Sequence, residues 1–129
     1  MWKKTTNRDS CRLLVLNATN NTVVCTQGLT ANTFRTRLFG LLGRKGLAQD
    51  EGLLISPSSG VHTFGMSFPI DIVALDSHNC VIGAFRDVGP RAIRGLSLKT
   101  RSVLELPSGK IQAAEINLGH QLVIGTAQT

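Results

Sequence analysis

Short apolar runs, each bounded by turn-forming residues, recur along most of this 129-residue chain. Runs of this length, rich in Val, Ile, Leu and Phe, are typical of strands joined by tight connections. Regular alternation of strand and helix patterns is absent, which argues against a doubly wound parallel sheet. The sequence therefore predicts a mainly β fold, a small antiparallel β-sandwich or barrel-like domain. The expected strands are Cys11–Leu16, Thr22–Gln27, Leu53–Ile55, Val61–Met66, Asp71–Leu75, Cys80–Phe85, Ser102–Leu106 and Gln121–Ile124.

Two segments have helical signals. Thr30 is suited to cap a helix, and Phe34, Leu38 and Leu42 then share one face, which predicts the main helix over residues 30–42. A second, short helix is expected from about Lys110 to Ile116. The predicted core is Leu14, Leu16, Val24, Phe34, Leu38, Leu54, Phe64, Met66, Ile72, Val73, Leu75, Val81, Leu104, Leu106 and Leu122.

Composition and length favour one soluble domain. The chain has 14 Lys and Arg against 8 Asp and Glu, a formal net charge of +6. Residues 1–9 form a basic segment without the apolar stretch of a secretory signal, and we expect a flexible arm there, followed by a single domain over residues 10–125. The uncharged stretch 52–70 is interrupted by Ser56–Gly60, so it is not a spanning helix. Three cysteines without a C-x-x-C pair suit a reducing compartment. We therefore expect a cytoplasmic protein with no membrane partner.

The segment from Val61 to Ile72 contains most of the chain's candidate chemistry. Pro69 should bend the chain, and Asp71 would then start a strand among apolar neighbours, where a carboxylate needs a partner. We expect His62 to be that partner, with Arg44 or Arg86 nearby as a positive group. A purely structural interpretation predicts the same contact, with no cavity beside it.

Several motifs along the chain resemble those of a prokaryotic family, domain of unknown function 192 (DUF192). The resemblance covers about residues 10–125 and implies a compact, mainly β sandwich with minor helices, but no established activity. In this chain His120 occupies a position where many members have Asp, and His78-Asn79 replaces a frequent Asp-Gly turn. The resemblance therefore carries no acidic site over to those turns. The motifs are Gly40–Arg44, Glu51–Leu54, His62–Met66, Pro69–Asp71, Leu75–Asp76, Leu104–Gly109 and Leu118–Gly119.

No complete catalytic or metal-binding pattern is present in the sequence. The three histidines are widely spaced, and no G-x-S-x-G motif occurs, so neither a metal nor a cofactor is expected. The leading hypothesis is a module that binds a small polar or anionic ligand, or a protein partner. The candidate ligand-binding residues are His62, Asp71, Arg44, Arg86 and Met66.

Two other functions stay open from the sequence. One is a small hydrolase-like enzyme that uses His62 and Asp71. The other is nucleic-acid binding through the basic surface, which is not expected because aromatic residues for base stacking are few, at 5% of the chain. Exposed strand edges are compatible with a monomer or a weak dimer.

Overall fold

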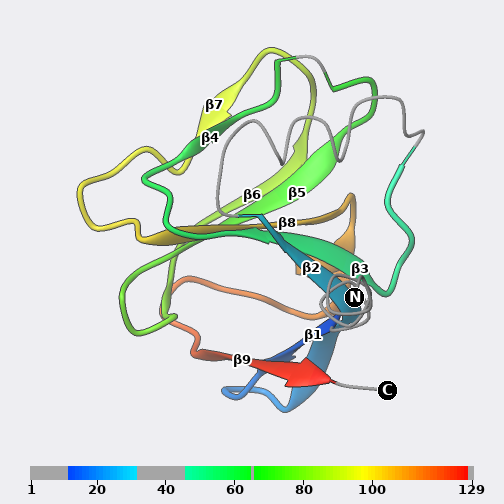
Figure 1. The fold of residues 1–129 in the computed structure, drawn as a ribbon, viewed down its shortest axis with the longest axis vertical. Helices are drawn as coiled ribbons and strands as arrows, with labels where there is room; N and C mark the ends of the chain where they lie inside the picture. Colours follow the sequence, from blue (N-terminus) through cyan, green and yellow to red (C-terminus); the bar gives the residue numbers. More distant parts are fainter. Residues whose placement is uncertain (1–11, 32–45, 65, 128–129) are drawn as a thin grey trace, which may run out of the picture.

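The computed structural model describes residues 12–31, 46–64 and 66–127, and most of their regular structure is β (Figure 1). Seven strands form one sheet and two short strands form another. The basic arm predicted over residues 1–9 lies outside the described residues. The elements are β1 (Arg12–Asn17), β2 (Thr22–Ala31), β3 (Glu51–Ile55), β4 (Val61–His62), β5 (Ile70–Leu75), β6 (Val81–Val88), β7 (Ile93–Arg94), β8 (Ser102–Pro107), α3 (Lys110–Ala113) and β9 (Leu122–Ala127).

The large sheet, in the order β6-β5-β8-β3-β2-β1-β9, curls into a half-barrel (Figure 1). Its two edge strands approach each other at one end, where Cys80 forms a bridge with Gln121. There the backbone N–H of Val81 also donates to the carbonyl of His120 at 2.9 Å. The prediction of a mainly β fold is confirmed, whereas a sandwich is not, because seven strands belong to a single curled sheet.

One neighbouring pair in this sheet is parallel. Strands β2 and β3 run in the same direction from Gln27↔Glu51 to Ala31↔Ile55, while the other neighbours are antiparallel. The sequence predicted a mainly antiparallel arrangement, and this parallel pair is the exception to it. Residues 32–50 separate the two strands, and a segment of that length can make the crossover that parallel strands require.

The long strand β2 also changes the predicted start of the main helix. Thr30 pairs with Leu54 and Ala31 with Ile55 in the parallel ladder, so neither begins a helix. Sheet pairing has overridden the local capping signal. The predicted helical residues from 32 onward, including Phe34 and Leu38, lie outside the described residues. The short helix is confirmed but ends earlier, at Ala113.

The sheet carries an apolar layer on each face. Residues from all seven strands of the half-barrel converge on the concave side, where α3 also packs. The β4–β7 pair covers part of the convex side. The concave layer contains Leu13, Val15, Val24, Cys25, Leu54, Val73, Leu75, Val81, Leu104, Leu106, Ile111, Ala114, Ile116 and Leu122. The convex layer contains Leu53, Ile55, Val61, Met66, Phe68, Ile70, Ile72, Val88 and Val103.

Most of the predicted core residues that the structure describes are buried, with three exceptions. In β1 the buried side chains are Leu13 and Val15 rather than Leu14 and Leu16, which are half-buried. Phe64 is 46% exposed, because β4 ends at His62 and its alternation does not continue. Within the described ranges, no helix is long and apolar enough to cross a bilayer.

Candidate functional site

The carboxylate of Asp71 joins the edge strand β6 to the start of α3. Asp71 is fully buried on β5, and its Oδ1 accepts the backbone N–H of Asp87 at 2.7 Å. Its Oδ2 accepts the backbone N–H groups of Gly109 at 3.1 Å and Ile111 at 2.8 Å. Three N–H donors satisfy a charge that would be costly to bury alone. One side chain on β5 therefore links the irregular part of β6 to the first turn of α3.

An irregularity in β6 turns the backbone toward this carboxylate. Ile72 pairs with Phe85 and Ile70 with Val88, so β6 contains one residue more than β5 over this interval. The extra residue forms a β-bulge, and Asp87 has a positive φ of 50° there. On the other element, the N-cap of α3 is Gly109, whose φ of 96° is readily adopted by glycine. The two conformations let both N–H groups point at Asp71.

A surface pocket of about 430 Å³ lies between these two elements, and we call it the β6–α3 pocket. Its volume falls within the range of small-molecule sites, roughly 300–1,000 Å³. Apolar side chains and polar groups both line it, as is usual for such sites. The lining residues are Ala84, Arg86, Ile111, Gln112, Glu115, Ile116, Asn117 and Leu118.

Arg86 is the cation of the β6–α3 pocket. Its side chain is exposed, and its guanidinium has no hydrogen bond or ion pair with any residue of the described ranges. A guanidinium can bind a carboxylate or phosphate through two parallel hydrogen bonds. The Gln112 and Asn117 amides offer donors and acceptors, and the Glu115 carboxylate adds a negative charge on the same lining. The pocket therefore combines one cation, one anion and two neutral amides.

His62 lies on β4, away from Asp71. Its Nδ1 accepts the backbone N–H of Phe64 at 3.2 Å, and the two rings are 5.0 Å apart. Ile70 and Ile72 belong to the convex layer that includes Val61 of β4. Because side chains alternate along a strand, Asp71 lies on the opposite face of the sheet.

The predicted contact between His62 and Asp71 is therefore wrong. The chain does bend between β4 and β5, but β4 packs on the convex layer while the Asp71 carboxylate binds backbone N–H groups on the concave side. The hydrolase-like alternative required His62 and Asp71 to act together, and the structure does not bring them together. Met66 is 5% exposed and packs in the convex layer, so it is a core residue. Arg44 lies outside the described residues.

Of the sequence candidates, Arg86 lines the β6–α3 pocket, and the buried Asp71 holds backbone groups of its two walls without lining it. Sequence reasoning missed Gln112, Glu115 and Asn117, because polar residues near a short helix usually indicate a solvent-facing surface. The Pro107-Ser108-Gly109 turn predicted the helix α3. It did not indicate that polar residues of this region line a pocket with Arg86. Among the described side chains, no cluster of His, Cys, Asp and Glu could hold a metal ion.

A second fully buried carboxylate, Glu105, also escaped the sequence analysis. It lies on β8, where it pairs across the ladders with Leu53 and Ile72. Alternation along β8 places it with Val103 on the convex side, opposite to Asp71. The two buried acids therefore belong to different layers and do not form one site.

Comparison with protein families gives one match, in which residues 15–124 fit the model of DUF192, described as "Uncharacterized ACR". The search of curated proteins gave no match.

Two solved structures share this fold. One is a candidate transcription regulator from Sinorhizobium meliloti 1021, with 21% identity and a TM-score of 0.72, covering 88% of this chain and 92% of that one. The other is a protein of unknown function from Novosphingobium aromaticivorans DSM 12444, with 20% identity and a TM-score of 0.72, covering 86% of this chain and 82% of that one. At these identities the likeness concerns the fold alone.

Proposed function

This chain belongs to the DUF192 family, and we propose that it is a binding module whose β6–α3 pocket holds a small polar ligand with an anionic group. The family description assigns no activity, so the proposal rests on the site. The observation that carries it is the guanidinium of Arg86, which lines a pocket of ligand size and has no partner among the described residues.

Arg86 lies next to a part of the backbone that is held in place by a buried side chain, which supports a role in binding. Arg86 immediately precedes Asp87, whose N–H is held by the buried carboxylate of Asp71. The same carboxylate holds Ile111, which lines the opposite wall of the pocket. Both walls are therefore positioned before a ligand arrives, which lowers the cost of ordering them on binding.

The lining also suggests which ligands fit. A single carboxylate or phosphate can pair with Arg86, while Glu115 can accept a hydrogen bond from a hydroxyl or an ammonium group of the same ligand. Because Glu115 repels further negative charge, ligands of low net charge that carry a hydrogen-bond donor beside the anionic group are favoured over polyanions such as citrate.

A thermal-shift titration tests this proposal. The probes are acetate, L-glutamate, inorganic phosphate and citrate, since a ligand that binds only the native state raises the apparent stability. We expect L-glutamate or phosphate to raise the midpoint, and Arg86→Gln to abolish the rise. The matched control is Arg91→Gln, which removes an exposed arginine outside the pocket. Equal responses of Arg86→Gln and the unmodified chain would contradict the proposal.

A further inference from the structure

The loop between β7 and β8 projects from the side of the molecule (Figure 1) and contains two leucines, Leu96 and Leu98. Leu96 is 74% and Leu98 94% exposed. Single exposed apolar residues are common and need no explanation, but two within three residues on a projecting loop form a local apolar surface. We name the group Leu96, Leu98, Lys99 and Arg101 the Leu98 tip.

This loop is held by hydrogen bonds to the body of the protein. The Arg101 N–H donates to the Leu75 carbonyl at 2.8 Å, and the Ser97 N–H to the Ser59 carbonyl at 3.2 Å. Within the loop, the Thr100 hydroxyl donates to a backbone carbonyl at 2.7 Å. The leucines are therefore presented by an anchored backbone.

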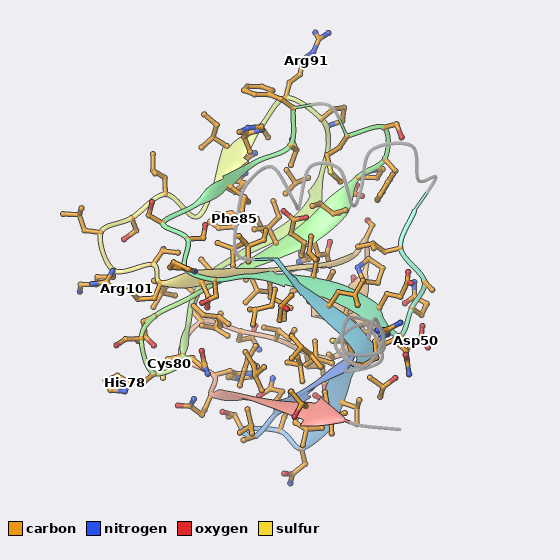
Figure 2. The ribbon with its side chains drawn as sticks, viewed as in Figure 1. Asp50, His78, Cys80, Phe85, Arg91 and Arg101 are labelled. Carbon is orange, nitrogen blue, oxygen red and sulfur yellow. The ribbon has the colours of Figure 1, made fainter. Side chains whose placement is uncertain are left out.

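The charged residues of this segment of the chain are all cationic. Between Asp87 and Glu105 the sequence contains four cationic residues and no acidic one. The Arg101 guanidinium donates to the Leu98 carbonyl at 2.6 Å, so a cation lies at the base of the most exposed leucine. Figure 2 shows Arg101 at the left of the view and Arg91 at its top, both pointing away from the body, so Arg101 belongs to the tip and Arg91 lies away from it. The four cations are Arg91, Arg94, Lys99 and Arg101.

We propose that the Leu98 tip binds the surface of a membrane that contains anionic lipids. The two leucines enter the boundary between headgroups and acyl chains, and Lys99 and Arg101 contact the lipid phosphates. Arg101 also lines a hollow beside Ser58 and Ser59, where a headgroup can sit next to its guanidinium. Charge complementarity and an apolar tip act together, and neither alone gives stable attachment.

Other macromolecules fit this surface less well. Energetically dominant residues in protein interfaces are mostly Trp, Tyr and Arg, and Leu is under-represented among them. Single-stranded nucleic acids bind on aromatic stacking platforms, whereas the tip carries leucines. The sequence contains no spanning segment, and no membrane partner was therefore expected, but a loop that lies in the membrane interface needs no such segment. The proposal is independent of the β6–α3 pocket.

Vesicle co-sedimentation tests it. The probes are vesicles of phosphatidylglycerol and phosphatidylcholine at equal ratio, and vesicles of phosphatidylcholine alone. We expect the full chain to sediment with the anionic vesicles only, and to be released as salt is raised, because exposed charges are screened. Leu96→Ser combined with Leu98→Ser should weaken binding at least tenfold, and Lys99→Gln with Arg101→Gln should weaken it and flatten the salt dependence.

Matched controls separate the tip from general charge and hydrophobicity. Val123→Ser removes an exposed apolar residue on β9, Lys110→Gln a cation on α3, and Arg86→Gln the pocket arginine; all three should bind vesicles like the unmodified chain. Circular dichroism establishes that each variant is folded. Failure to bind anionic vesicles, or equal binding by the leucine variant, would overturn the proposal. Retention by immobilised polyglutamate without vesicle binding would assign the tip to an acidic protein instead.

Discussion

The Oδ1 atom of Asp71 accepts the backbone N–H of Asp87 at 2.7 Å, across the bulge that ends the regular pairing of β5 and β6. The neighbouring Oδ2 accepts two N–H groups at the start of α3. One buried side chain thus sets the spacing of the two walls of the β6–α3 pocket. A residue that sequence reasoning proposed as a ligand-binding group acts instead as a positioning residue.

Replacement of Asp71 by Asn should destabilise the protein strongly. The amide keeps the volume of the side chain, but its NH₂ group would face N–H donors that the carboxylate now satisfies. Loss of charge-assisted hydrogen bonds together with unsatisfied buried donors predicts a cost of about 3 kcal/mol in the free energy of unfolding. Urea unfolding measures it, with Asp50→Asn as the exposed control. A cost below about 1 kcal/mol would show that the carboxylate does not hold these elements.

The cysteines should differ in reactivity. Burial raises the pKa of Cys25 to about 11, so at pH 8 only about one molecule in a thousand carries the reactive thiolate. Cys80 is half-buried, and its thiol lies 3.1 Å from the Oε1 of Gln121. Iodoacetamide should therefore modify Cys80 in the native protein and Cys25 only after denaturation, as peptide mass spectrometry can establish. Equal native rates would contradict the burial of Cys25.

The turn between β5 and β6 should contribute a pH-dependent stability. Backbone N–H groups of Cys80 and His78 donate to the Asp76 carboxylate at 2.9 and 2.8 Å and hold its pKa below the ordinary value. Because the folded-state pKa is the lower one, this contribution is fully present above the unfolded-state pKa and is lost as the pH falls through the folded-state pKa. Asp76→Ala should thus be less stable than the unmodified chain at pH 7, and the difference should shrink toward pH 2. A difference that stays constant in urea titrations at both pH values would refute this.

Local sequence patterns predicted where strands and helices lie better than they predicted which strands pair with each other. The β1–β2 hairpin, β5, β8 and the short helix could be placed because apolar runs and turn residues mark them. In β1, however, Leu13 to Leu16 are all apolar, so the sequence could not indicate which alternate set faces the core. Strands β2 and β3 pair in parallel, although residues 32–50 separate them in the sequence. The hydrophobic pattern within a strand does not indicate which strand will pair with it, so this pairing could not be predicted.

At the candidate site, too, the residue types could be predicted from the sequence, but their contacts could not. The need of Asp71 for a partner was predictable from its apolar neighbours, but its partners are backbone N–H groups, which no residue pattern reveals. Arg86 was a candidate for its charge alone. That it faces Gln112 and Asn117 follows from the curl of the sheet and the position of α3, both of which are set by long-range packing.

A titration followed by two-dimensional ¹H–¹⁵N NMR tests the central claim most directly. Isotope-labelled protein is titrated with L-glutamate and, separately, with inorganic phosphate. The account predicts saturable shift changes that concentrate on residues 84–86 and 111–118 and disappear in Arg86→Gln, while Arg91→Gln responds like the unmodified chain. Shift changes that concentrate elsewhere, persist in Arg86→Gln, or fail to appear with either anion would contradict it.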